Sequence, residues 1–426
     1  MKRIVLITFL LIVFCFSACT FSAGGEMAPV SSETDTAPSE TQTATETIQG
    51  WDFNNRFGGG QSSVVETDNA YYFTPFTGFY LYYYDKASGE RGVLCGKPEC
   101  IHDAIMQNTS CNGYLCLDGT LGYWDDRLHF LTYYPGESGR NFSLLSMKLD
   151  GTDRRADVST SLMIGSTYYT PQRLDYHHGM LYSYCTNEIV RNGVPSCETC
   201  IFRMDPKTGE LKKLFSLETD HSYSIPSLFY AGKYVYFSLD HREKTDDNWI
   251  TYLDIWRYDI EAEQIDDLYH FREEGYLGAW MHIWVESEDL IYLMPHFMLD
   301  GDPSKLYQIS GGELNVAVGF DIEGIGGISD GIAFVLSSPT NHMEVRRLDG
   351  SVIYSGAWEL DSLRELISGK ETDFYVNAAF GNENELLVSI NMFKAGNNPP
   401  SSTCLVKYDL TKTVPEATVL AFDPWQ

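Results

Sequence analysis

Residues 201–215, IFRMDPKTGELKKLF, hold the pattern that decides the fold. An apolar segment ends at Asp205, a turn containing Gly209 follows, and a second segment returns. Asp and Gly tolerate the backbone angles of tight turns, so this pattern predicts a β-hairpin. It recurs along the chain as YLYYYDKASGERGVL from Tyr80, LLSMKLDGTDRRADV from Leu144, IWRYDIEAEQIDDLY from Ile255, LYQISGGELNVAV from Leu306, EVRRLDGSVIYSG from Glu344 and LVKYDLTKTVPEATVL from Leu405.

A second hairpin precedes each copy of this pattern. A short strand, a turn rich in Asp, Asn or Gly and a very apolar strand follow one another in VVETDNAYYFTPF, YWDDRLHFLTYY, LDYHHGMLYSYC, LFYAGKYVYFSL, WVESEDLIYLM, GISDGIAFVLSS and FGNENELLVSI. Seven pairs of hairpins predict an all-β fold, a β-propeller of seven four-stranded blades over residues 50–426. The alternative is a β-sandwich with additional strands. It is less favoured, because double hairpins of one kind recur over the whole chain.

The amino terminus has the features of a lipoprotein signal peptide, residues 1–18. Two basic residues precede the apolar run 4–16, which is shorter than the ~20 residues that a membrane-spanning helix needs. Small residues then precede Cys19, as a lipoprotein signal peptidase requires. We therefore expect a lipid on Cys19 that anchors an extracytoplasmic protein to the membrane. A plain secretory signal, with Cys19 unmodified, is the alternative.

Residues 19–49 are dominated by Ser, Thr, Ala, Glu and Pro and have few large apolar side chains. Such a segment cannot bury enough surface to fold, so we expect a disordered tether between the lipid and the propeller. Removing residues 1–18 takes away Lys2 and Arg3 and no acid, which moves the formal net charge from −29 to −31. This charge argues against nucleic acid as a partner. We expect a monomer.

Five potential ligands lie close together in LCGKPECIHDAIMQNTSCNGYLC: Cys95, Cys100, His102, Cys111 and Cys116. The segment connects the first predicted blade to the second and is longer than a propeller needs there. In an exported protein, four close cysteines most simply form two disulfides that staple a loop. A zinc site of mixed thiolate and imidazole ligands is the less favoured alternative.

A second group of cysteines lies in LYSYCTNEIVRNGVPSCETCIFRM. If Asn192-Gly193 forms the hairpin turn, Cys185 and Cys200 lie directly opposite each other, which makes a cross-strand disulfide plausible. A local bulge would select Cys197 instead. Cys404 has no evident partner in the sequence.

The segment Leu94–His102, with Cys111 after it, resembles a motif of extracytoplasmic lipoprotein β-propellers of Gram-positive anaerobes. In that family a blade carries Leu-Cys-x-Lys-Pro-x-Cys-x-His followed by a further cysteine. The lipoprotein signal and the repeats agree with the resemblance, although the motif itself covers little of the chain. It implies a surface propeller of TolB-like or YncE-like fold, and it brings no catalytic residues with it.

No catalytic motif withstands inspection of its context. Gly327–Gly331 matches the G-x-S-x-G motif of serine hydrolases, but a strand follows Ser329 where a nucleophile elbow requires a helix. The histidines at 177, 178, 221, 241 and 282 lie near predicted turns or strand ends and do not recur between blades. We therefore expect no catalytic residues, no metal ion and no cofactor.

Two functions fit a tethered propeller of this kind. The first is a binding or scaffold module whose axial funnel or loop face holds a peptide, a glycan or a protein. The second is an extracytoplasmic glycan-active enzyme, a hydrolase or a lyase, with its site in the funnel. An enzyme predicts converging carboxylates or a His/Tyr pair with shifted pKa values in a deep pocket, and a binding module predicts neither. The sequence favours the binding module.

Overall fold

The computed structural model describes one compact unit within Thr43–Gln426. The residues described are 53–58, 63–75, 79–102, 108, 110–115, 120–133, 141–161, 163–164, 167–168, 171–191, 194–219, 225–246, 248–299, 301–366, 372–394 and 402–424. The predicted signal peptide, the tether, Cys19 and Cys116 lie outside these residues. Among the residues described, no helix is both long and apolar enough to cross a membrane.

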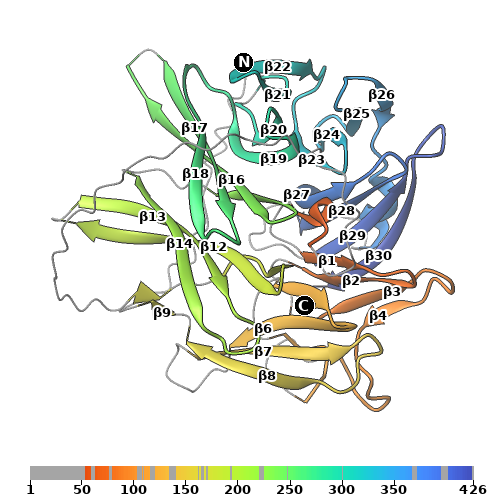
Figure 1. Ribbon diagram of the computed structural model, residues 1–426. Helices are drawn as coiled ribbons and strands as arrows, with labels where there is room; N and C mark the ends of the chain where they lie inside the picture. Colours follow the sequence, from red (N-terminus) through yellow and green to blue (C-terminus); the bar gives the residue numbers. More distant parts are fainter. Residues whose placement is uncertain are drawn as a thin grey trace. The chain divides into compact units, whose positions relative to one another are not determined.

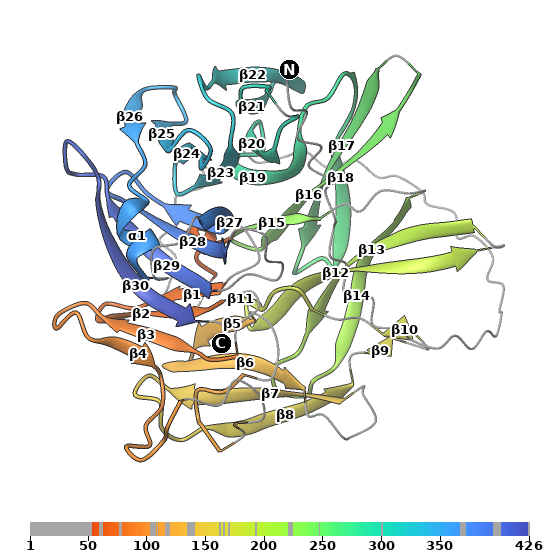
Figure 2. The ribbon, with the colours of Figure 1, turned by 180° about the vertical axis from the view of Figure 1, so that it is seen from behind.

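Seven four-stranded antiparallel sheets stand in a ring, so the predicted seven-bladed β-propeller is confirmed (Figures 1 and 2). Blade 1 contains β1 (Ser63–Glu66), β2 (Ala70–Thr74), β3 (Tyr82–Asp85) and β4 (Arg91–Val93). Blade 2 contains β5 (Leu121–Trp124), β6 (Arg127–Tyr133), β7 (Asn141–Lys148) and β8 (Arg155–Ser161). Blade 3 contains β11 (Asp175–His177), β12 (Met180–Arg191), β13 (Val194–Met204) and β14 (Leu211–Thr219).

The remaining blades follow the same order along the chain. Blade 4 contains β15 (Ser227–Ala231), β16 (Tyr234–Lys244), β17 (Trp249–Asp259) and β18 (Gln264–Glu274). Blade 5 contains β19 (Ala279–Ser287), β20 (Leu290–Phe297), β21 (Lys305–Ser310) and β22 (Glu313–Gly319). Blade 6 contains β23 (Ile325–Ser329), β24 (Ile332–Ser337), β25 (His342–Arg347) and β26 (Val352–Ala357). Blade 7 contains β27 (Thr372–Gly381), β28 (Glu385–Lys394), β29 (Ser402–Asp409) and β30 (Glu416–Pro424).

Four short elements lie outside the blades. The strands β9 (Met163–Ile164) and β10 (Thr167–Tyr168) pair with each other between blades 2 and 3 in the sequence. The α-helix α1 (Asp361–Leu366) connects blade 6 to blade 7, and the 3₁₀-helix η1 (Asn55–Phe57) precedes blade 1. The first strand of each blade is the innermost one: β1 contacts β5, β5 contacts β11, and β15, β19, β23 and β27 contact one another in turn, while η1 contacts β1, β23 and β27.

Most of the core lies in seven buried apolar clusters, one at each interface between adjacent blades, and a smaller eighth cluster surrounds Cys185 and Cys200 in blade 3. Each sheet therefore buries both faces, which explains why the second strand of every hairpin pair is so apolar. The cluster that joins the last blade to the first contains Val64, Tyr71, Phe380 and Leu420. All four strands of each blade are consecutive in the chain, so the ring closes by side-chain packing, without exchange of a strand.

The recurrent aspartate of the sequence pattern caps the turn between the third and fourth strands. Its carboxylate accepts a hydrogen bond from the backbone N–H two residues later, as an Asx turn requires. This contact recurs at Asp85, Asp150, Asp205, Asp259, Asp349 and Asp409. A register shift then interrupts the pairing of the third and fourth strands in blades 2 to 7. Such bulges increase local twist near the outer edge of each blade.

Candidate functional site

The segment Asn54–Gly58 crosses the centre of the ring. Asn55 exchanges two hydrogen bonds with the backbone of Tyr230 on blade 4, at 2.6 and 2.8 Å. The guanidinium of Arg173, next to blade 3, donates to the carbonyl oxygens of Phe57 and Gly58. Because inner strands of well-separated blades meet this one segment, it occupies the central channel. We refer to Asn54–Gly58 as the axial plug.

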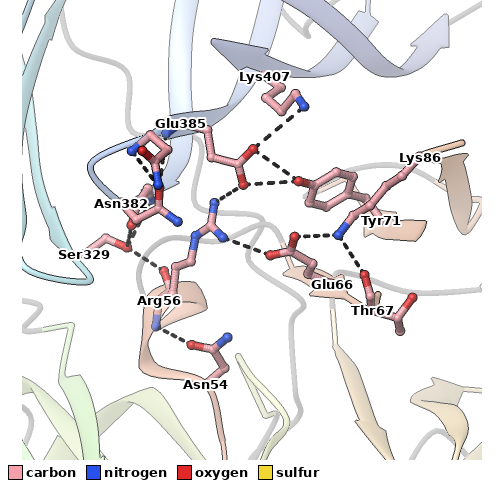
Figure 3. A network of polar contacts seen from close by, with 12 residues as sticks. Asn54, Arg56, Glu66, Thr67, Tyr71, Lys86, Ser329, Asn382, Glu385 and Lys407 are labelled. Atoms are coloured by element: carbon pink, nitrogen blue, oxygen red, sulfur yellow. Dashed lines mark hydrogen bonds and ion pairs between the residues drawn. The ribbon is translucent and has the colours of Figure 1, made fainter. Parts of the chain in front are cut away.

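Arg56 is the centre of the polar network that joins the axial plug to blades 1 and 7 (Figure 3). Its guanidinium lies 2.9 Å from the carboxylate of Glu66 on β1 and 2.5 Å from that of Glu385 on β28. Tyr71 donates to Glu385, and Lys86 binds Glu66 at 2.7 Å. Two carboxylates converge here, but both are held by cations. We call this network, in which Arg56 joins Glu66 of blade 1 to Glu385 of blade 7, a structural clamp. In a glycoside hydrolase the two carboxyl groups face the substrate instead, one as acid and the other as base or nucleophile.

Ser329, the serine of the G-x-S-x-G match, belongs to the same clamp. It ends β23, and Ile332 begins β24 after a two-residue turn, so the segment is a hairpin. The hydroxyl of Ser329 donates to the carbonyl oxygen of Arg56 at 2.8 Å and accepts from the N–H of Gly381 at 3.0 Å. The serine is 1% exposed. Its hydroxyl fixes backbone segments to one another, and none of its hydrogen-bond partners among the described residues is a histidine.

An axial pocket lies beside the plug. It encloses about 530 Å³ between protein atoms, counting the part open to solvent. Residues from blades 3, 4, 5 and 7 form its wall: Gly58, Arg173, Tyr184, Ile225, Pro226, Ser227, Trp280, Met281, His282, His296, Tyr375 and Asn377. Among these described residues there is no aspartate or glutamate. The wall combines aromatic rings with a few polar groups, as small-ligand pockets commonly do.

The axial pocket is electrically neutral at neutral pH. Burial lowers the pKa of His282 to about 4 and that of His296 to about 3, so both imidazoles are uncharged. Their ring nitrogens lie 3.4 Å apart. The charge of Arg173 is balanced by Asp175 at 3.0 Å. Burial raises the pKa of Tyr375 to about 12, so its hydroxyl keeps its proton.

Trp280 lies in the wall with a left-handed backbone, at φ 56°. A bulky residue at positive φ is strained by about 1–3 kcal/mol, and such strain gathers at functional sites. The buried carboxylate of Asp240 holds this conformation by accepting from the N–H groups of Trp280 and Met281, at 3.3 and 3.0 Å. The indole packs against the rings of His296 and Phe297, with centroids 5.8 and 4.8 Å away. The fold therefore fixes the position of this aromatic face.

Asn377 supplies an unused hydrogen-bond donor to the pocket wall. Its side chain is on the inner strand β27 and is only 3% exposed. The Oδ1 atom accepts from Asn391 at 3.0 Å, but Nδ2 has no partner among the residues that the structure describes. A buried amide without a partner costs about 1–3 kcal/mol, so such a group calls for an explanation. A bound acceptor in the pocket would provide one.

Four of the five residues of the first cysteine-rich segment converge in one place. The ligand atoms of Cys95, Cys100, His102 and Cys111 all lie within 4.8 Å of one another. We refer to these four residues as the Cys–His cluster. Burial acts to raise the pKa of Cys95, but hydrogen bonds from His102 and from backbone N–H groups lower it to about 6. A thiolate is therefore favoured at Cys95 at neutral pH.

The other cysteines are buried between strands. The register of β12 and β13 places Cys185 directly opposite Cys200, as the sequence predicts. The hydrogen bond between their sulfurs and their burial raise the pKa of Cys185. The disulfide between them stays a prediction. Cys404 is fully buried in the interface between blades 6 and 7, where burial raises its pKa to about 12.

The remaining histidines of the sequence analysis are dispersed over the propeller. His177 contacts the carbonyl oxygen of Gly232 at 2.7 Å, and His241 stacks on Tyr252 with ring centroids 4.4 Å apart. His221 lies outside the described residues. Of the histidines singled out in the sequence, His282 is the one that lines the axial pocket, together with His296 from the neighbouring strand β20.

The sequence analysis missed most of the axial pocket. Trp280, His296, Tyr375 and Asn377 carry no motif, and they come from two places far apart in the chain, the β19–β20 hairpin of blade 5 and β27 of blade 7. A partial signal was available in β19 and β27, because the innermost strand of a blade borders the axis and these two strands carry Trp280, Tyr375 and Asn377. That signal requires the order of the strands within each blade, which a hairpin pattern alone supplies only in part.

Among known proteins, the chain is similar to solved structures of low sequence identity. No protein-family model and no curated protein matches the chain. Similar structures include TolB from Acinetobacter baumannii, at 14% identity over 70% of this chain and 63% of that one, with a TM-score of 0.32. They also include YjhT, at 11% identity over 70% and 96% with a TM-score of 0.38. The α-L-arabinofuranosidase of Fusarium graminearum matches at 10% identity over 69% and 89%, with a TM-score of 0.35.

The chain therefore spans less than two thirds of TolB, and each of these likenesses is weak. Among the three, only the arabinofuranosidase has a name that states an activity.

Proposed function

We propose that the protein is an extracytoplasmic binding module, anchored to the membrane through a lipid on Cys19, whose axial pocket takes an uncharged sugar ring of a glycan. The observation that carries the proposal is the pocket wall itself. It offers a fixed indole, a buried amide donor and neutral imidazoles, and the described wall contains no carboxylate.

The chemistry of the wall favours a neutral sugar over a charged ligand. A sugar ring presents an apolar face to an aromatic side chain and hydroxyl oxygens to a donor such as Asn377 Nδ2. A charged ligand would have to give up water without meeting an opposite charge, because the guanidinium of Arg173 is already engaged by Asp175 and by the axial plug. The sequence supports the anchored location through the signal peptide and the tether.

A glycan-active enzyme is the second candidate, and one observation favours its lyase form. His282 and Tyr375 have shifted pKa values and line the same pocket, and a neutral imidazole is able to accept a proton. The hydrolase form lacks support, because the described wall offers no pair of carboxylates for acid–base work.

The test is a glycan and peptide array probed with the full chain, followed by calorimetry and product analysis on each hit. We expect binding of neutral glycans that Trp280→Ala and Asn377→Ala each weaken at least about tenfold, as loss of roughly 1.4 kcal/mol implies. Trp249→Ala, which removes an indole outside the pocket, is the matched control and should bind normally.

Three outcomes count against the binding module. Hits confined to peptides would replace the sugar by another ligand class. Cleavage of a glycan with loss of turnover in His282→Ala would establish the enzyme instead. Binding that Trp280→Ala leaves unchanged would move the site away from the axial pocket.

A further inference from the structure

The described residues of the connection between blades 1 and 2 that carry the Cys–His cluster, 94–102 and 110–115, are attached to both blades. The guanidinium of Arg154 on blade 2's outer hairpin donates to the carbonyl oxygens of Cys111, Asn112 and Tyr114, at 3.1, 2.7 and 2.6 Å. On the other side, the N–H of Leu81 donates to the carbonyl oxygen of Gly113 at 2.8 Å. These contacts fix the backbone around Cys111, one of the four residues of the cluster.

Two matching turns present sulfur atoms to the centre of the cluster. The N–H of Lys97 donates to the sulfur of Cys95, and the N–H of Gly113 donates to the sulfur of Cys111. In both turns the donor lies two residues after the cysteine. Such N–H groups stabilise a sulfur that carries negative charge, which is the form in which cysteine binds a metal.

Three sulfurs and one imidazole, the ligand atoms that converge here, are a suitable set for zinc. A disulfide joins two sulfurs, so one bond among Cys95, Cys100 and Cys111 would leave the third sulfur and His102 beside it, and two disulfides would require Cys116, which lies outside the described residues. Zinc takes four such ligands tetrahedrally, with Zn–S near ~2.3 Å and Zn–N near ~2.0 Å. The ligand atoms then lie about 3.5–3.8 Å apart, which the observed convergence within 4.8 Å approaches by small side-chain movements.

We propose that the Cys–His cluster binds one zinc ion in a closed structural site. All four positions are filled by protein ligands, so no position stays open for a substrate or an activated water. Three thiolates and a neutral imidazole around Zn²⁺ leave one net negative charge, which the neighbouring Lys97 offsets. Lys97 also donates to the carbonyl oxygen of Ser110, which links the two turns of the segment. The ion ties together a connection that has little apolar core of its own.

The test begins with metal content in the full chain, purified under nitrogen without chelator and measured by plasma mass spectrometry. We expect about one zinc ion per chain. His102→Ala and Cys111→Ser should each reduce this at least tenfold. His342→Ala, which changes a histidine on blade 6, should retain the ion.

A second measurement uses the unaltered chain, so that a misfolded variant cannot obscure the result. Cobalt exchanged into the site should give the absorption of tetrahedral Co²⁺ with thiolate ligands. Alkylation in denaturant and chelator, without reductant, should label Cys95, Cys100 and Cys111. Removing the ion should lower the melting temperature of the unaltered chain and leave that of His102→Ala unchanged.

Two results would overturn the zinc site. The first is a disulfide that includes Cys95, Cys100 or Cys111 in the purified chain. The second is a failure of the reduced protein to take up either zinc or cobalt at equimolar amounts. Zinc retained by both His102→Ala and Cys111→Ser would count against the site in the same way.

Discussion

At the scale of single residues, Trp280 is the least expected feature of the propeller. A tryptophan rarely adopts a left-handed backbone, because its Cβ then approaches the following carbonyl oxygen. The conformation persists because Asp240 accepts from two successive backbone N–H groups at this point. Gly278 lies just before it at φ +116°, where an added Cβ would come within 2.3 Å of Pro295. This turn directs the indole to the axis.

The strain at Trp280 predicts an unusual order of stability among its variants. The free energy of unfolding of Trp280→Gly, measured with urea, should exceed that of Trp280→Ala by about 1 kcal/mol, because glycine alone is relaxed at positive φ. At Trp249, where the backbone has no positive φ, alanine should be the more stable of the two. Equal stability of the two variants at position 280 would show that the residue is not strained.

At the scale of the structural element, the unit of this fold is the hairpin closed by an aspartate. The pKa of Asp85, Asp349 and Asp409 is held below its usual value by hydrogen bonds from the residues of the turn. A carboxyl group with a lowered pKa in the folded state stabilises that state above the unfolded pKa. The contribution is lost as the pH falls through the folded value, because the unfolded chain then binds more protons.

The turn aspartates therefore predict sensitivity to acid. The melting temperature of the unaltered chain should fall more steeply below about pH 4 than that of a variant with Asp85, Asp349 and Asp409 changed to Asn. Asparagine keeps the acceptor oxygen of the Asx turn and has no titrating group, which makes it the matched substitution. Parallel melting curves between pH 5 and pH 3 would assign the acid sensitivity to other carboxyl groups.

At the scale of the whole molecule, the ring is closed by apolar packing and by the axial plug. The plug makes hydrogen bonds or ion pairs with blades 1, 3, 4, 6 and 7 through a few consecutive residues. Blade 1 and blade 7 share no strand, so their connection depends on their apolar interface, on the two ion pairs of Arg56 and on side-chain hydrogen bonds such as that of Tyr71 to Glu385. The same plug forms part of the pocket wall through Gly58.

Removing Arg56 should therefore weaken the entire ring. Its side chain is 8% exposed and faces two carboxylates, so Arg56→Ala leaves two partly buried charges without their partner. We expect a loss of about 3 kcal/mol in the free energy of unfolding, measured with urea. Arg155→Ala, which breaks an ion pair of an arginine that is 57% exposed, should cost less than about 1 kcal/mol. Similar losses for both variants would contradict the role of the clamp.

The sequence by itself determined the blades. A hairpin depends on neighbouring residues, on an aspartate at the turn and on two apolar strands, so local pattern was enough to predict seven pairs of them. The register that places Cys185 opposite Cys200 followed from the same local geometry. The Ser329 match was recognised as a turn because a strand comes directly after it.

Only the tertiary structure decided where chemistry is located. Arg173, Trp280 and Tyr375 are separated by about a hundred residues each, and they share one pocket solely because the ring closes. The Cys–His cluster lies within one short segment, yet spacing alone favoured disulfides over a metal. The arrangement of its two turns and of His102 depends on how blades 1 and 2 hold the segment, and that arrangement is the basis of the zinc site that we propose.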